Sequence, residues 1–101
     1  MLKKVYEREG SICSVTFTIR AEEAGDATSA TLVGDFNSWD SKAMPMKRNK
    51  KGCFELKTDL SPGREYQFRY LLDGTRWEND WNADKYVPSP YGDIENSVVI
   101  V

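Results

Sequence analysis

The sequence predicts an all-β domain, built as an antiparallel β-sandwich. Apolar residues alternate with polar ones in several short segments, and turn-forming residues separate these segments about every eight to twelve positions. No segment shows the apolar spacing of an amphipathic helix. With 101 residues, of which 40% are hydrophobic, the chain suits one domain with one modest core, which we place at residues 11–101.

The first strand signal comes early in the chain. Residues 1–10 are polar and mixed, which predicts either a frayed arm or a short edge strand. Residues 11–20 alternate cleanly and are rich in β-branched side chains, so we expect a strand there. Residues 21–29 predict a loop or one helical turn. In the strand, the residues expected to face the core are Cys13, Val15, Phe17 and Ile19, and those expected to face water are Ser14, Thr16 and Thr18.

The middle of the chain predicts two strands with a polar turn and a hairpin between them. Pro45 cannot donate a ladder hydrogen bond, so its short extended segment belongs at a sheet edge. Gly52 suits the positive φ of the hairpin turn. The expected elements are a strand at 30–34, a polar turn at 35–43, the edge segment at 44–47, the hairpin turn at 48–52 and a strand at 53–58.

The strongest strand signal covers residues 64–72. Its apolar positions share one face because side chains alternate along a strand. Asp73-Gly74 then predicts a tight turn into a short strand at 75–78. The side chains expected on the core face of the long strand are Tyr66, Phe68, Tyr70 and Leu72.

The end of the chain predicts a long loop and a last strand. Residues 79–92 show no regular pattern, and a structureless segment of this length in a small domain is often functional. We expect Trp81, Tyr86 and Tyr91 to pack this loop against the domain. The apolar run at 98–101 predicts a strand covered on both faces.

Charge and composition argue against several classes of partner. Fourteen basic and sixteen acidic residues give a net charge of −2, so no basic field favours nucleic acid or an acidic membrane. The basic cluster in the hairpin turn lacks the interleaved aromatic residues of a nucleic-acid site. No apolar run approaches the ~20 residues of a membrane span, and the N-terminus lacks the apolar stretch of a secretory signal. We therefore expect a cytoplasmic protein.

The side chains of common catalytic and metal sites are absent or scattered. There is no histidine, which is the commonest general base and metal ligand. We expect Cys13 and Cys53 inside strands as free thiols that fill apolar space. A glycosidase pair or a calcium site is disfavoured, because the domain is too small for a deep cleft and the carboxylate spacing matches no calcium loop. We expect no enzyme, cofactor or metal; the carboxylates considered are Asp80, Asp84, Asp93 and Glu95.

Two tryptophans follow strand ends. Trp39 lies at the tip of the polar turn, and Trp77 comes shortly after the Asp-Gly turn. A large apolar ring in water is costly unless something covers it, so the pair favours a binding surface. Alternatives stay open: either ring can instead anchor its segment in the core, and Arg69 can be an ordinary solvated strand residue.

Three segments carry a family resemblance. Gly34–Trp39 matches the turn G-x-F-N-x-W, and Leu60–Gly74 matches the block L-x-P-G-x-x-Y-x-[YF]-[KR]-[FY]-x-[VL]-D-G. Tyr91–Val99 is similar to a last strand that follows G-x-x-N-x. Together they resemble carbohydrate-binding module family 48, the isoamylase-type early-set domains, which include the glycogen-binding domain of the AMP-activated kinase β subunit. The resemblance covers nearly the whole chain and implies an immunoglobulin-like early-set sandwich.

The resemblance also implies a function and a site. It implies non-catalytic binding of α-1,4-glucans, such as glycogen, starch and maltooligosaccharides, through a tryptophan platform. Glu95 stands where the kinase-type domains carry a sugar-contacting Asn, and the neighbouring Asn96 can supply that amide instead. The alternative function is a protein-interaction domain that docks a carbohydrate-metabolism or kinase-like partner without binding sugar. The other implied site residues are Trp39, Arg69, Trp77 and a protruding Tyr91.

Overall fold

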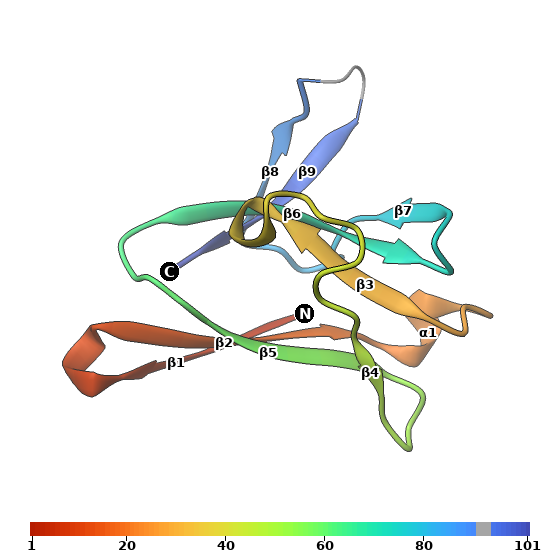
Figure 1. Cartoon of the computed structure of the whole chain (residues 1–101), viewed down its shortest axis with the longest axis horizontal. Coiled ribbons are helices and arrows are strands. Elements are labelled where there is room, and N and C mark those ends of the chain that lie inside the picture. The colour runs from red at the N-terminus through yellow and green to blue at the C-terminus, as the bar shows by residue number, and fades with distance from the viewer. Residues whose placement is uncertain (91–93) are drawn as a thin grey trace.

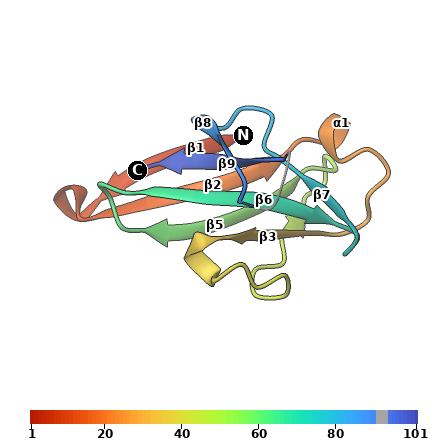
Figure 2. The ribbon, with the colours of Figure 1, turned by 90° about the horizontal axis from the view of Figure 1, so that it is seen from above.

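The computed structural model describes residues 1–90 and 94–101 and shows two antiparallel sheets packed face to face (Figure 1). Sheet A has the strand order β1-β2-β5-β4; sheet B has the order β3-β6-β9-β8, with β7 also paired to β6. Seen from above, β6 and β9 lie over the strands of sheet A (Figure 2). The predicted all-β, immunoglobulin-like sandwich is confirmed. The strands are β1 (Leu2–Glu7), β2 (Ile12–Ile19), β3 (Ala30–Gly34), β4 (Lys47–Arg48), β5 (Phe54–Leu60), β6 (Glu65–Leu72), β7 (Arg76–Glu78), β8 (Lys85–Pro88) and β9 (Glu95–Ile100).

Only short helical turns interrupt the strands. They are α1 (Ala21–Ala24) and the 3-10 turns η1 (Arg8–Gly10) and η2 (Asp35–Asn37). Among the described residues, no helix is long and apolar enough to cross a bilayer. The described part of the chain also holds no group of three or more His, Cys, Asp or Glu side chains suited to a metal ion.

The core fills the space between the two sheets. Alternate residues of β2 and β6 point into it, as their sequence pattern predicts. The Phe17 and Phe68 rings meet edge to face across the sheets at a centroid distance of 5.1 Å. Phe36 of η2 packs on Phe17 at 5.6 Å and so pins the η2 turn to the core.

The outer face of sheet B is partly apolar. Val33 of β3 and Leu71 of β6 alternate away from the core, yet both are buried. Their cross-strand partners on the same face are Arg69 and Trp77 respectively. Since Arg69 and Leu71 lie two positions apart on β6, the register puts the guanidinium and the Trp77 indole on the same face as diagonal neighbours.

Several local predictions need correction. Of the two alternatives for residues 1–10, the structure has the edge strand, β1. Ser14 is buried rather than facing water, and Ile100 is exposed although we expected both faces of the last strand to be covered. Cys53 precedes β5 instead of lying within it, although both thiols are free as expected. Gly52 has the positive φ that we expected, +82°.

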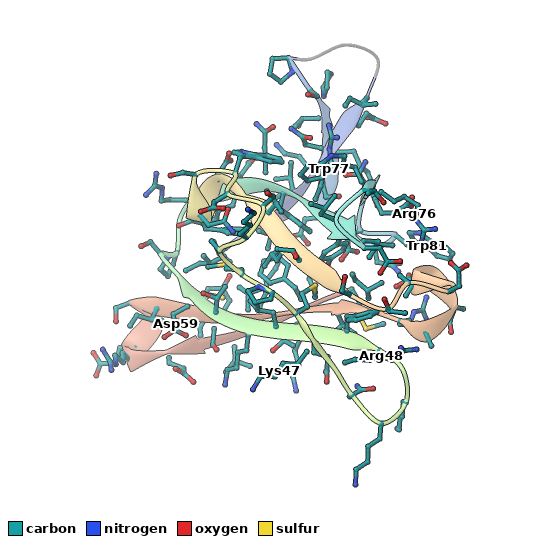
Figure 3. All side chains as sticks on the ribbon, turned by 45° about the vertical axis from the view of Figure 1, so that its right-hand side comes forward. Lys47, Arg48, Asp59, Arg76, Trp77 and Trp81 are labelled. Atoms are coloured by element: carbon teal, nitrogen blue, oxygen red, sulfur yellow. The ribbon has the colours of Figure 1, made fainter. Side chains whose placement is uncertain are left out.

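The predicted loop at 79–92 is wrong in two respects. It contains β8, which pairs antiparallel with β9. Trp81 does not pack the segment down: it is 58% exposed and projects from the chain just after β7 (Figure 3). The segment is held instead by the buried Asp80, whose backbone N–H donates to the Ser97 hydroxyl at 2.9 Å and whose carbonyl accepts from the Tyr86 hydroxyl.

Candidate functional site

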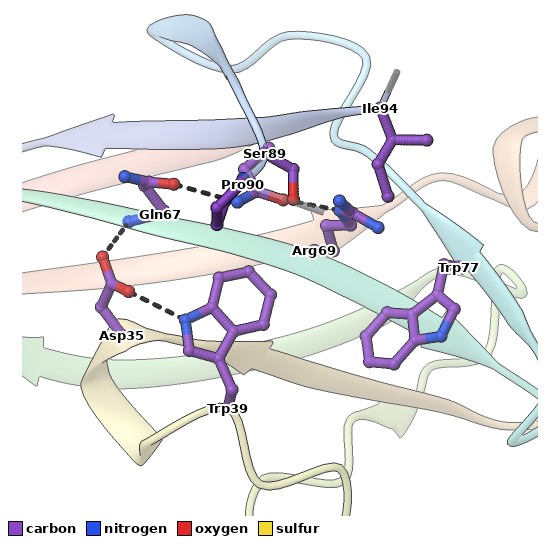
Figure 4. A pocket seen from close by; sticks show the side chains of 9 residues that line it. Asp35, Trp39, Gln67, Arg69, Trp77, Ser89, Pro90 and Ile94 are labelled. Carbon is purple, nitrogen blue, oxygen red and sulfur yellow. Dashed lines mark hydrogen bonds between the residues drawn. The ribbon is translucent and has the colours of Figure 1, made fainter. Parts of the chain in front are cut away.

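The outer face of sheet B contains a groove of about 560 Å³. Trp39 and the η2 turn, here called the Trp39 wall, form one side, and β7 with Trp77, the Trp77 wall, forms the other (Figure 4). Arg69 of β6 lies between the two rings (Figure 4). Trp39 and Trp77 are 36% and 45% exposed respectively, and each presents part of its surface to the groove. The described lining residues are Asp35, Trp39, Gln67, Arg69, Trp77, Ser89, Pro90, Ile94 and Asn96.

The backbone of the Trp39 wall is tightly fixed. A Cβ at Gly34 would lie 2.5 Å from the carbonyl oxygen of Gln67, so only glycine lets β3 approach β6 this closely. The Asn37 side chain accepts from the Gly34 N–H at 3.1 Å and donates to the Leu32 carbonyl at 2.9 Å. Trp39 itself has a left-handed backbone, φ 57°, and its N–H donates to the Gly34 carbonyl at 2.9 Å. Such strained non-glycine residues persist only where surrounding contacts hold them.

The Trp39 ring is also held by its side chain. Its indole N–H donates to Oδ1 of Asp35 at 2.8 Å, and Oδ2 of the same carboxylate accepts the backbone N–H of Gln67 at 2.7 Å (Figure 4). The ring is thus tied through one carboxylate to β6, the strand that carries Arg69.

A chain of side-chain hydrogen bonds orients the middle of the groove. Arg69 donates its Nε–H to Oδ1 of Asn96 at 2.7 Å, and Asn96 donates from Nδ2 to Oε1 of Gln67 at 2.9 Å. Burial lowers the pKa of the Arg69 guanidinium from its ordinary value, and the guanidinium stays charged near neutral pH. The Nε bond fixes the plane of the guanidinium, and no hydrogen bond or ion pair to another described residue is recorded for its two terminal nitrogens. They are donors suited to a ligand.

The hydrogen bonds that hold the Trp77 wall lie at the turn before β7, away from the Trp77 ring. The Asp73-Gly74 turn joins β6 to β7, and Oδ1 of Asp73 accepts the backbone N–H groups of Thr28 and Ser29 at 2.9 and 3.0 Å. These bonds hold the pKa of the Asp73 carboxyl below its ordinary value of 3.8. The Trp77 indole N–H donates no hydrogen bond to any other described residue.

Comparison with known protein families shows which family the chain belongs to. Residues 8–92 match the family model described as carbohydrate-binding module 48, the isoamylase N-terminal domain. The chain belongs to carbohydrate-binding module family 48. Its matched portion contains both tryptophan walls and Arg69.

Relatives of this family 48 domain include much longer proteins. The 1,4-alpha-glucan-branching enzyme of Emericella nidulans is 48% identical over 54 residues, which are 52% of this chain and 8% of the enzyme. Protein FLOURY ENDOSPERM 6, chloroplastic, of Oryza sativa subsp. japonica is 39% identical over 54 residues, 54% of this chain and 10% of that protein. The 1,4-alpha-glucan branching enzyme GlgB 1 of Xanthomonas axonopodis pv. citri is 42% identical over 48 residues, 46% of this chain and 7% of the enzyme. The matched segments therefore span a tenth or less of these relatives.

The family 48 groove brings together four of the residues implied by the resemblance: Trp39, Arg69, Trp77 and Asn96. Neither tryptophan anchors its segment in the core, and Arg69 is half-buried rather than simply solvated. Glu95 is exposed opposite Pro88 in the β8–β9 register and is not among the groove-lining residues. Tyr91 lies outside the described residues.

Sequence reasoning missed other lining residues of the family 48 domain. Gln67 shares the outer face with Arg69 because it lies two positions earlier in the same strand, so strand parity alone could have found it. Asp35 stands inside the G-x-F-N-x-W turn at a position that the motif leaves variable. Pro90 and Ile94 flank the undescribed residues and gave no sequence signal.

The carboxylates considered for catalysis lie elsewhere in the family 48 domain. Asp80 is buried and accepts from the Tyr70 hydroxyl at 2.6 Å and from the amino group of Met1. Burial, followed by the charge of Asp80, raises the pKa of Tyr70 well above 10.0. Asp84 pairs with Lys4 at 2.6 Å. Neither lines the groove, and Asp93 lies outside the described residues.

Proposed function

We propose that the groove binds one chain of an α-1,4-glucan and that this domain performs no chemistry on it. The observation that carries the proposal is the pair of half-exposed indole rings on either side of an oriented guanidinium, on a single face of the sandwich. Membership of a carbohydrate-binding family supports the class of ligand.

The chemistry of the groove suits a glucose polymer. A glucan has an apolar C–H face and an edge of hydroxyl groups; flat rings cover the first and fixed polar groups bind the second. The terminal nitrogens of Arg69 and the amide nitrogen of Gln67 offer donors between the two walls. A neutral ligand makes binding nearly independent of salt.

The exposed fractions set the scale of affinity. A tryptophan buries about 150–250 Å² when fully covered, and less than half of each ring remains exposed, so each ring gains roughly 2 kcal/mol gross when sugar covers it. Ordering of the sugar and desolvation of polar groups offset much of this gain, so we expect a dissociation constant between roughly 10 μM and 1 mM.

The groove offers little for catalysis. Asp35 is the carboxylate among the described lining residues, and both of its oxygens already accept hydrogen bonds. Glycoside hydrolysis uses a pair of carboxyl groups flanking the bond that breaks. This supports a binding role for the domain.

The test is a titration of the protein with maltoheptaose or β-cyclodextrin, in which binding is measured by calorimetry and by tryptophan fluorescence. Trp39→Ala and Trp77→Ala should each weaken binding at least tenfold, about 1.4 kcal/mol, without unfolding the protein. Trp81→Ala is the matched control, because Trp81 is exposed but outside the groove. Absence of binding by the wild type, or equal losses in all three variants, would refute the assignment.

A second candidate function is docking of a protein partner. The exposed Trp81 and Tyr86, 58% and 40% accessible, lie in the segment where that alternative predicts an apolar surface. Retention of the wild type on amylose resin favours the glucan; no retention, together with loss of a partner complex in Trp81→Ala, favours docking.

A further inference from the structure

We propose that Asp35 is the positioning residue of the groove, whose carboxylate fixes the Trp39 ring in the free protein; its effect on affinity rests on the proposed glucan function. Both carboxylate oxygens are used. Oδ1 accepts the indole N–H of Trp39 at 2.8 Å, and Oδ2 accepts the backbone N–H of Gln67 at 2.7 Å (Figure 4).

The hydrogen bond from Gln67 extends the β3–β6 pairing by one step beyond the last backbone pair. The β3–β6 register ends with Gly34 opposite Phe68, and the chain then turns into η2. The next backbone N–H of β6 in this direction belongs to Gln67, and the Asp35 side chain satisfies it in place of a strand carbonyl. Asp35 is therefore anchored to the central strand of sheet B rather than to the turn alone.

The hydrogen bond from the Trp39 indole N–H to Asp35 fixes the ring relative to β6. Backbone contacts fix where the Trp39 Cα lies, but they leave the side chain free to rotate. A charge-assisted hydrogen bond to the indole N–H selects one orientation, in which part of the ring lines the groove. A ring already held in place loses less freedom when sugar binds, which strengthens binding.

Asp35 also decides what Trp39 offers to a ligand. With the N–H committed to the carboxylate, Trp39 presents a ring surface only. Trp77 has no such partner among the described residues. The two rings therefore differ in role: Trp39 is a fixed stacking surface, and Trp77 retains a free donor and more freedom.

The binding test compares two neighbouring carboxylates. Asp35→Ala should weaken maltoheptaose binding about tenfold. Asp35→Asn keeps the shape but can accept only one of the two hydrogen bonds, so it should show an intermediate loss. Asp40→Ala is the matched control, because it removes the same charge from the same turn. Among the described residues, the Asp40 carboxylate accepts the Lys42 N–H alone, so affinity should change less than about twofold.

Two readouts separate positioning from a general loss of stability. In a Trp39→Phe background, Asp35→Ala should cost much less than in the wild type, because the group through which it acts is gone. In a Trp77→Phe, Trp81→Phe background, Trp39 is the sole tryptophan, and Asp35→Asn should enlarge its sub-nanosecond anisotropy decay without sugar present.

The outcomes distinguish this inference from the proposed function. Unchanged affinity and unchanged anisotropy in the Asp35 variants, with binding lost in Trp39→Ala, would overturn the role of Asp35 and leave the glucan function intact. No sugar binding by the wild type would refute the function and with it the predicted effect of Asp35 on affinity; anisotropy in the free protein still decides whether Asp35 fixes the ring. If Asp35→Ala fails to fold, the isosteric Asp35→Asn carries both measurements.

Discussion

The two walls of the groove carry the same kind of ring on differently built supports. The Trp39 wall is held next to its ring: Asp35 binds the indole N–H, and the backbone is closed onto β3. The Trp77 wall is held at its far end, where Asp73 in the β6–β7 turn accepts the N–H groups of Thr28 and Ser29 in the segment before β3. One wall is therefore rigid up to the ring, and the other is fixed only as a hairpin.

The difference shows how one site can combine pre-organisation with adaptation. A fixed ring lowers the entropic cost of the first stacking contact. A ring with a free N–H can adjust to a second glucose unit and donate to one of its hydroxyl groups. Substitutions that change one support at a time should have different consequences on the two sides.

The largest expected effect is at Gly34, which precedes the Trp39 wall, and the comparison is with Gly74, which precedes the Trp77 wall. Gly34→Ala places a Cβ 2.5 Å from the Gln67 carbonyl and 2.8 Å from the Phe68 Cβ, so β3 and β6 must separate, and we expect a loss of about 3 kcal/mol of unfolding free energy. In Gly74→Ala the new Cβ has no atom within 4 Å. Only the strain of a positive φ at alanine lowers the unfolding free energy, by about 1 kcal/mol. Urea unfolding measures both, and equal losses would contradict the close-approach explanation.

Exchanging each indole for a phenyl ring tests the comparison directly. Trp39→Phe removes the donor to Asp35 and should reduce maltoheptaose affinity about tenfold, whereas Trp77→Phe keeps a stacking ring and should reduce it about threefold. Calorimetry gives both values under one set of conditions. A larger loss for Trp77→Phe would mean that the free donor of Trp77 matters more than the fixed orientation of Trp39.

Sequence alone predicts on which side of the sheet Arg69 lies. Strand alternation puts Arg69 on the outer face once Phe68 and Tyr70 are assigned to the core. For Trp77 the sequence leaves both faces open, and the structure places it beside Leu71 on the outer face. Of the two alternatives left open for Trp39, the structure has the exposed ring at the tip of the turn, while Phe36 of the same turn packs against the core. Local periodicity suffices for Arg69 because the alternating core residues of its own strand fix its orientation.

Other features depend on contacts that periodicity does not encode. β8 has four residues, ends at Pro88 and pairs with β9 ten positions further on, so it has no alternation to detect. The exposure of Trp81 follows from the burial of the preceding Asp80, an acidic residue that a sequence argument places at the surface. The partner of the Asp35 carboxylate is a backbone N–H on a distant strand, which no motif specifies.

A smaller effect is expected at the residue between the walls. Arg69→Lys keeps the charge but loses the planar guanidinium, whose Nε–H donates to Asn96 while its two terminal nitrogens face the ligand. We therefore expect about a fivefold loss of affinity. Arg64→Lys is the control, because Arg64 lies over the Tyr66 ring outside the groove. Isothermal titration at low and high salt checks both variants. Full affinity in Arg69→Lys would mean that charge alone, rather than oriented donors, serves the site.

The smallest expected effect concerns the far support of the Trp77 wall and depends on pH. Hydrogen bonds from the backbone of Thr28 and Ser29 lower the pKa of Asp73 below 3.8, so folding favours its charged form. That stabilisation is complete above the unfolded pKa and is lost as pH falls through the lower, folded value. Asp73→Asn should therefore lower stability slightly near pH 6 and make the loss between about pH 4 and pH 2 shallower than in the wild type.

Urea unfolding at several pH values measures this difference, with Asp26→Asn as the control. Asp26 is an exposed carboxylate near the segment that Asp73 binds, and the described structure records no hydrogen bond to its side chain. If Asp73→Asn and Asp26→Asn give the same acid profile, the Asp73 bonds do not support the Trp77 wall. A distinct profile with unchanged maltoheptaose affinity would instead show that the hairpin can loosen at its turn while its ring still reaches the sugar. That result would strengthen the contrast with the Trp39 wall, where support and ring are joined by one carboxylate.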